Sequence, residues 1–452
     1  MTTELNQEII SSMEHALHYA LKKSDQAEIM LGRSESFSLA ADQGKIDKYQ
    51  ISNARSVGVR LIRGNQVGIS YTENIDSKSL EEMIDLAAVN AKLMKEDPYQ
   101  KIISPIGEKK LINIHEKNFA EDNTPTNEKI ELCLSLESKV KALDSKIKSA
   151  PYNGYSESTG ESYLINSEGL FSYERSRRFS CYTSCLMEEG AKNGMHYEGM
   201  SARRFSELNP NKIVEKSYQI AKGFFEATTL ASGKYDIVFT PDCLQDFLGC
   251  FSIIYSGKST AEGKNPFKDK LNSPVFSSLL TIIDSPKYAD ASYYHLFDDE
   301  GSAMDDLTLI KDGVLKNFYH NSATAKELNQ ENNYRASRST KGQLGVGGTV
   351  KIITPGTSDE INVLERPYLE IISMQGLHSG ANAISGDFSF AISGLYHNDG
   401  QVKPFKGITL SGNFYHLMKN NISQVSNLLH SDTYKSFFAP TIRFNQLSVS
   451  GV

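Results

Sequence analysis

The stretch SVGVRLIRGNQVGISYT, residues 56–72, contains two runs of alternating apolar and polar residues separated by Gly64–Asn65. Alternation with a period of two predicts strands with one buried face, and a short Gly/Asn connection predicts a tight hairpin between them. The preceding segment SFSLAADQGKIDKYQIS, residues 36–52, has the same pattern around Gln43–Gly44. Together these runs predict an antiparallel meander.

Helical patterns flank the meander. Residues 5–23 place apolar side chains at three- and four-residue steps, which predicts an amphipathic helix. Ser79 with Glu82 resembles a capping box that opens a helix reaching about Met94. The loop-rich residues 97–126 indicate a subdomain boundary. Further helices are expected at 130–143 and 213–227, on either side of a second strand series broken at 166–169 and 190–194.

The second half of the sequence is richer in strand-like patterns. Residues 235–239 predict a strand stopped by Pro241, followed by a helix from Asp242 to about Ser256. From Ser278 onward the chain is strand-like, with helices expected at 324–329 and 415–429. We therefore expect an α+β protein, with an N-terminal helix-plus-antiparallel-sheet domain (1–229) and a β-rich C-terminal domain with short helices (230–452).

Composition narrows the function classes. The chain has 452 residues and a formal charge of -7, with 48 Lys and Arg against 55 Asp and Glu. A net acidic protein has no general attraction for nucleic acid, so direct nucleic-acid binding is not expected. The five cysteines form no metal or disulfide pattern, and no signal peptide or membrane span is evident. We expect a soluble, cytoplasmic protein.

Motifs of metal and nucleophile chemistry are weak. His15 and His18 are three residues apart on a predicted helix but lack an evident third ligand, and His115–Glu116 fails as a zincin motif because position 119 is Phe. Ser379, His378 and Asp387 occur close together in the sequence without a nucleophile elbow. Four cysteines, Cys181, Cys185, Cys243 and Cys250, have spacings typical of packing rather than of a nucleophile or redox site.

Several dispersed segments carry a family resemblance. Their order and spacing over nearly the whole chain resemble the TldD/TldE (PmbA) metallopeptidase family. The segments are SVGVRLIRGNQVGISYT (56–72), NSEG (166–169), SGKYDIVFTP (232–241), DDEG (298–301), LIKDGVLKNFYHNSATA (309–325), SGANAISGDFSFAISGLYHNDGQ (379–401), KGITLSGNFYHLMKNN (406–421) and FFAPTIRFNQLSVSG (437–451).

The resemblance implies where a metal motif would fall. TldD-like members carry HExxxH on the first helix after the strand that opens the C-terminal domain, with two His as zinc ligands and a Glu that activates water. In this chain the motif falls on residues 248–253, where Leu248, Gly249 and Ile253 replace His, Glu and His. The C-terminal segment also lacks the Cys of TldD-like members. The resemblance thus implies no catalytic or metal-binding residue here, and zinc in a TldD-like partner.

The implied role is that of a TldE/PmbA-type subunit. Such a chain forms a heterodimer with a TldD-like subunit, binds unfolded or peptide substrates, and is inactive alone; a homodimer without the partner stays open. Asp299, Glu300 and Gly301, with Gly386, Asp387 and Phe388, would support the substrate chamber or the subunit interface; the alternative is a tight turn and a core strand. An extended peptide could add to an exposed sheet edge of the C-terminal domain.

The sequence leaves one alternative function open and disfavours another. The chain could instead be a self-sufficient hydrolase with an unrecognised site. That alternative predicts activity of the chain without a partner, whereas the subunit role predicts none. Modulation of DNA topology, which older naming of the family suggests, is disfavoured by the acidic charge and by the lack of a basic stripe.

Overall fold

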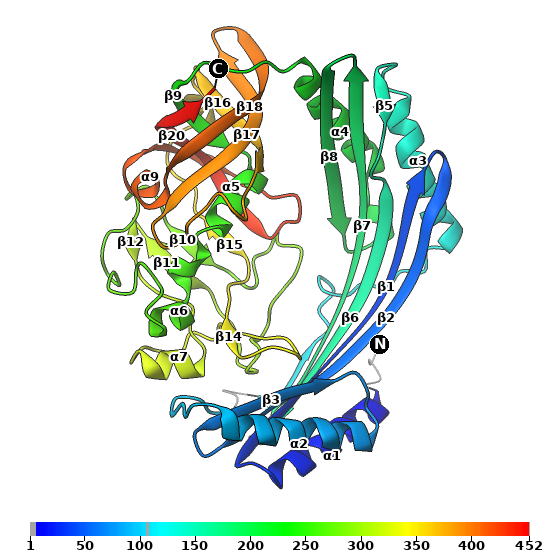
Figure 1. Ribbon diagram of the computed structural model, residues 1–452, viewed down its shortest axis with the longest axis vertical. Coiled ribbons are helices and arrows are strands. Elements are labelled where there is room, and N and C mark those ends of the chain that lie inside the picture. Colours follow the sequence, from blue (N-terminus) through cyan, green and yellow to red (C-terminus); the bar gives the residue numbers. More distant parts are fainter. Residues whose placement is uncertain (1–5, 105–107, 452) are drawn as a thin grey trace.

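The computed structural model describes residues 6–104 and 108–451 and is dominated by two large sheets (Figure 1). One sheet of eight strands belongs to the N-terminal half, and one of ten strands belongs to the C-terminal half. Helices pack on both. The predicted α+β class is confirmed, whereas the predicted domain limits of 229 and 230 stay a prediction.

The N-terminal sheet is built around long antiparallel hairpins. Strands β1 (Gln26–Asp42) and β2 (Lys45–Arg63) pair along their length and turn at Gln43–Gly44, where both residues have positive φ (51° and 73°). That conformation suits the turns that join twisted strands, so the predicted meander is confirmed. The other strands are β3 (Gln66–Thr72), β4 (Lys110–Asn113), β5 (Ile147–Ser149), β6 (Gly154–Asn166), β7 (Phe171–Glu189) and β8 (Lys192–Ala202), and the main order is β3-β2-β1-β6-β7-β4.

Two helix pairs cover the ends of this sheet. Helices α1 (Gln7–Leu21) and α2 (Ser77–Leu93) pack on one end, and α3 (Thr126–Lys141) and α4 (Pro210–Glu226) pack on the other. A short 3₁₀ turn, Phe205–Glu207, precedes α4. All four predicted helices are confirmed. The predicted cap of α2 is wrong: Asp76 is the N-cap residue, and its carboxylate accepts the Ser79 N–H at 3.0 Å.

Five strands of the C-terminal half close into a ring. They are β9 (Gly233–Phe239), β16 (Tyr368–Gln375), β17 (Asp387–Asn398), β18 (Gln401–Asn413) and β20 (Phe437–Ser450), and β20 returns to pair with β9. A closed ring satisfies the backbone groups of its own strands. The five strands of the ring are therefore paired with one another, and any addition of an extended peptide would have to use edge strands outside the ring, such as β12 or β19. Edge addition stays a prediction.

A branch from β15 and β20 completes the sheet. It contains β10 (Ile282–Asp284), β11 (Leu307–Lys311), β12 (Val314–Leu315), β15 (Lys351–Ile353) and β19 (Ile422–Ser431), while β13 (Ala336–Ser337) and β14 (Gly345–Val346) form a separate pair. The helices of this half are α5 (Pro241–Gly249), α6 (Gly257–Ala261), α7 (Ser322–Glu327), α8 (Glu360–Val363) and α9 (Phe414–Asn420), with a 3₁₀ turn at Ser252–Tyr255.

Two predicted helices are too long. The helix expected to reach Ser256 ends at Gly249, and only the 3₁₀ turn follows. The helix expected at 415–429 ends at Asn420, because residues from Ile422 pair with β20 as a strand. A tertiary ladder overrides the local helical spacing there.

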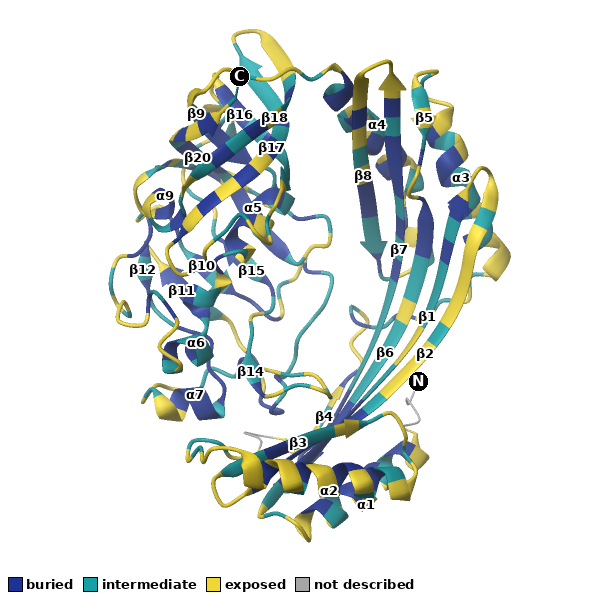
Figure 2. Cartoon of the chain, in the orientation of Figure 1, coloured by how far each residue is buried: buried dark blue, intermediate teal, exposed yellow. Residues whose placement is uncertain are grey.

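Buried residues concentrate under the helices and within the C-terminal ring, whereas the turn-proximal half of β2 is exposed (Figure 2). Phe247 of α5 stacks on Phe239 of β9 at 5.3 Å, and Phe251, which follows α5, stacks on Phe414 of α9 at 4.1 Å. Within the described part of the chain, no helix is both long and apolar enough to cross a membrane.

Candidate functional site

The three residues to which the family resemblance assigns the metal motif line a cavity of about 480 Å³. Leu248 and Gly249 contribute the end of α5, and Ile253 follows in the 3₁₀ turn. The opposite wall comes from residues 346–349, β15 and the start of β20. We treat this cavity, called the α5 cavity below, as the candidate site because it lies where the family resemblance puts the chemistry.

The lining does not fit a zinc ion. Leu248 is buried in the core, Ile253 packs against the same core, and neither has a donor atom. Zinc in proteins is held by Cys, His and carboxylates. The polar lining here consists of serine and threonine hydroxyls, the Gln245 amide, the Tyr319 phenol and one lysine. Across residues 6–104 and 108–451, no group of three or more His, Cys, Asp or Glu residues could hold a metal ion.

The hydroxyls of the cavity are partly engaged already. Ser436 accepts a hydrogen bond from Gln245 Nε2 at 3.1 Å and donates one to Asp432 at 2.9 Å. Ser256 Oγ accepts the N–H of Ser259 at 3.0 Å, as the N-cap of α6. These bonds fix the walls, and neither Ser256 nor Ser436 has a His or Lys partner among the described residues that could activate its hydroxyl.

Lys351 is the one charged residue among the described residues that line the cavity. It shares a face of β15 with Ile353, which is fully buried, so its stem lies on the core side of the sheet. Its Nζ lies 4.9 Å from the centroid of the Tyr255 ring. Within the described residues no Asp or Glu carboxylate lies within 4.0 Å of Nζ. Burial lowers the pKa of Lys351, and the charge of Asp284 opposes that shift.

The carboxylate of the strand residue paired with Lys351 already has other partners. Asp284 is opposite Lys351 in the β10–β15 pair, but it accepts hydrogen bonds from Arg335 Nε at 2.6 Å and from Thr349 at 2.7 Å. A buried arginine already balances its charge. One sequence signal for Lys351 exists: in GTVKIIT, residues 348–354, the lysine is two residues from Ile353 and therefore points to the same face of the strand.

Gly348 lines the same cavity and lies against Tyr319. A Cβ atom at this position would lie 2.3 Å from the Oη atom of Tyr319, which also lines the cavity. Only glycine lets the backbone approach the buried phenol so closely.

The predicted support residues Asp299, Glu300 and Gly301 lie outside the α5 cavity, in a buried turn at the junction of the two halves. Gly301 has φ 78°, and a Cβ on it would lie 2.3 Å from the Leu170 side chain of the N-terminal half. Asp299 accepts the N–H of Arg338 at 2.8 Å. Glu300 accepts the N–H of Ser322 at 2.9 Å. The turn thus docks on the β6–β7 hairpin, within one chain.

Buried charges surround this turn. Glu28 on β1 pairs with Arg60 on β2 at 2.8 Å and with Arg338 of the C-terminal half at 3.1 Å. All three side chains are at most 3% exposed. Burial raises the pKa values of Asp299 and Glu300, and burial together with the charge of Glu300 raises that of Asp298 to about 7.

Comparison with known proteins matches the chain to three family models in succession. They are PmbA/TldA metallopeptidase domain 1 (residues 27–91), the central domain (119–223) and the C-terminal domain (232–451). The chain belongs to the PmbA/TldA metallopeptidase family.

Full-length relatives agree. An uncharacterised protein of Methanocaldococcus jannaschii is 26% identical over 91% of this chain and 94% of its own length. The metalloprotease PmbA homologue of Haemophilus influenzae is 21% identical over 98% and 96% of the two chains. The crystal structure of TldE from Thermococcus kodakarensis superposes with a TM-score of 0.81 at 20% identity, covering 97% of this chain and all of that one, which shows a shared fold.

The second predicted set of this PmbA/TldA-family chain lies at the start of β17. Gly386 has φ 84°, and a Cβ would lie 2.5 Å from the Tyr415 ring. Asp387 is exposed, and hydrogen bonds from Asn413 and Ser385 lower its pKa. Phe388 is buried against Phe247 at 5.0 Å. These residues support the ring and α9, and none lines the α5 cavity.

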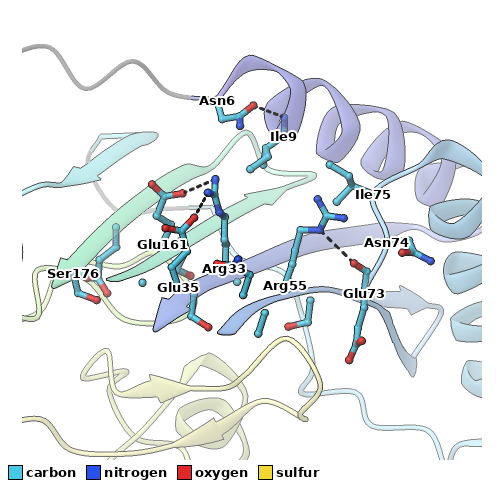
Figure 3. A pocket seen from close by; sticks show the side chains of 18 of the residues that line it. Asn6, Ile9, Arg33, Glu35, Arg55, Glu73, Asn74, Ile75, Glu161 and Ser176 are labelled. Carbon is cyan, nitrogen blue, oxygen red and sulfur yellow. Dashed lines mark hydrogen bonds and ion pairs between the residues drawn. The ribbon is translucent and has the colours of Figure 1, made fainter. Parts of the chain in front are cut away.

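A larger hollow of about 1100 Å³ lies on the N-terminal sheet (Figure 3). Arg33 points toward both Glu35 (2.5 Å) and Glu161 (3.9 Å). Arg55 donates to the Glu73 carbonyl at 3.3 Å. The charged side chains there are largely paired with one another, so they do not indicate one class of ligand. We therefore prefer the α5 cavity as the candidate site.

The other sequence candidates do not assemble. His15 is half exposed and bonds Glu81 at 3.1 Å, and the His115 ring packs on Tyr294. The Asp387 carboxylate bonds Ser385 and Asn413 rather than His378 or Ser379. Four cysteines are buried, and burial raises the pKa of Cys133 to about 11 and those of Cys181, Cys185 and Cys243 to about 12.

Proposed function

We propose that this chain is the metal-free partner subunit of a TldD/TldE-type peptidase, which binds unfolded or peptide substrates while a TldD-like subunit with zinc cuts them. The observation that carries the proposal is the identity of Leu248 and Gly249 at the end of α5 and of Ile253 in the 3₁₀ turn that follows. Metal-assisted hydrolysis needs imidazole or carboxylate ligands and a base beside the bound water. An aliphatic residue, a glycine and a second aliphatic residue supply neither.

The rest of the family fold is retained. Models of all three family domains match the chain, and the residues to which the resemblance assigns the motif line the α5 cavity. A fold kept without ligands for a metal suits a role in binding and assembly, since function lives in the site and not in the fold. The unpaired thiols of the five cysteines fit the proposed cytoplasmic, reducing location.

Peptide cleavage tests the proposal. The purified chain, a purified TldD-like subunit from the same organism, and an equimolar mixture would each be incubated with an unfolded protein and a short peptide. Metal would be measured in each sample by mass spectrometry, and assembly by light scattering. We expect cleavage by the mixture alone, with no stoichiometric metal in this chain. Cleavage by this chain alone would establish a self-sufficient hydrolase instead.

A further inference from the structure

We propose that the α5 cavity binds a carboxylate group of a peptide, with Lys351 as its ion-pair partner. The inference rests on the proposed function for the choice of a peptide as the ligand. The site itself is argued from the residues that line the cavity.

The first step is the missing partner of Lys351. Its side chain leaves the strand on the same face as Ile353 and lines the cavity, where it is partly buried and its only described close partner is the Tyr255 ring, 4.9 Å from Nζ. A cation placed there without a counter-ion is costly unless something pairs with it. Asp284 is already bonded to Arg335 and Thr349, so the protein does not supply that partner. A bound anion would.

The second step concerns the charge and size of the ligand. The described lining residues contribute one positive charge and no negative charge, together with hydroxyl and amide groups. A volume of about 480 Å³ is in the range of small-ligand pockets. The cavity thus suits one singly charged group with short polar neighbours, as at the end of a peptide.

The third step separates a carboxylate from a phosphate. Phosphate sites use the bidentate fork of arginine or several converging cations. The α5 cavity has no arginine among its described lining residues, and its single ammonium matches a single carboxylate. A peptide can present that group at its C-terminus or on an Asp or Glu side chain, and the capture of a terminal carboxylate is a recurring mode of peptide recognition.

Binding to the chain alone tests the inference. N-acetyl-Ala-Ala-Ala with a free C-terminus, its C-terminal amide, and N-acetyl-Ala-Glu-Ala amide would be titrated and followed by saturation-transfer NMR. We expect the amide to bind at least tenfold more weakly than one or both carboxylate peptides, and the comparison of the two identifies the source of the carboxylate. We further expect Lys351→Met to weaken carboxylate binding at least tenfold. Lys311→Met, at an exposed position of β11 outside the cavity, should leave binding unchanged.

A second measurement keeps the test valid if Lys351→Met fails to fold. The lysines of the unaltered chain would be methylated with ¹³C-formaldehyde, and the Lys351 signal would be assigned with Lys351→Arg. Addition of the better carboxylate peptide should shift that signal, and the amide should not. Equal binding of the amide, or an unmoved Lys351 signal, overturns the inference. The readout is independent of cleavage, so a failure of the subunit proposal in the mixture experiment would be seen separately.

Discussion

The guanidinium of Arg338, in the C-terminal half, lies 3.1 Å from the carboxylate of Glu28 on β1 of the N-terminal half. Arg60 of β2 shares the same carboxylate at 2.8 Å. The junction therefore holds a buried ion triad, with Glu28 and Arg60 from the N-terminal sheet and Arg338 from the C-terminal half. Removing the one shared anion leaves two buried cations without their partner.

Glu28→Gln is expected to lower the free energy of unfolding by about 3–5 kcal/mol, as for other buried pairs that lose one partner. Urea denaturation followed by circular dichroism measures the change. The matched control is Glu73→Gln. Glu73 pairs with Lys341 at 3.0 Å across the same two halves, but its side chain is 70% exposed, so a change below about 1 kcal/mol is expected. Equal losses in the free energy of unfolding for the two variants would show that the buried triad contributes no more than an exposed ion pair.

Gly301→Ala should lower the free energy of unfolding by more than the cost of placing alanine at a positive φ. Gly301 and Gly400 have similar φ values (78° and 70°), but a Cβ meets the Leu170 side chain at 2.3 Å only at position 301. Gly400→Ala should cost about 1 kcal/mol, and Gly301→Ala about 1–3 kcal/mol more. The extra loss should shrink when Leu170→Ala is added. If the Leu170 contact is not the cause, the loss in the free energy of unfolding of the double variant should equal the sum of the losses of the two single variants, which would contradict this explanation.

Lys351→Met should stabilise the free chain at neutral pH, by roughly 1 kcal/mol. Burial lowers the pKa of Lys351 below its ordinary 10.5, so between the two values the unfolded chain binds more protons than the folded one. The stability of the unaltered chain should therefore rise with pH through that window. The advantage of Lys351→Met should be largest at neutral pH and vanish above about 10.5. Urea midpoints at pH 7, 9 and 10.5 measure it; an advantage that grows with pH would contradict the assignment.

The native chain should show little thiol reactivity. Four cysteines are buried with raised pKa values, and only Cys250 is partly exposed. Thiolate formation controls the reaction with Ellman's reagent. We expect at most one fast-reacting thiol in buffer and all five in urea. A second fast-reacting thiol would reopen a cysteine hydrolase for this chain.

Local patterns were enough to predict much of the fold. The pairs Gln43–Gly44 and Gly64–Asn65 identified both hairpin turns, and the apolar spacing from Ile9 to Ala20 identified α1, because turn chemistry and amphipathicity are local properties. The α9 error has the same origin. Ile422 and Val425 continue the helical spacing of Leu417 and Met418, yet they pair with β20.

The ring and the site depended on distant contacts. Closure needs β9 to meet β20, more than 200 residues later, and no local pattern specifies that pairing. The resemblance assigned the metal motif to Leu248, Gly249 and Ile253, and the fold brings these three residues to one wall of the α5 cavity. Their correspondence to the motif stays a prediction. Lys351 joins them through β15, which lies about 100 residues away in the chain, so sequence proximity gave no hint of it.

The most direct test of the central claim uses a disabled partner. A TldD-like subunit whose HExxxH glutamate is replaced by glutamine would be mixed with this chain and assayed on the peptide that the unaltered mixture cuts. The subunit account predicts complete loss of cleavage with assembly and partner metal retained, since this chain has Leu248, Gly249 and Ile253 where the resemblance assigns the motif. Residual cleavage that rises with the amount of this chain would contradict the account.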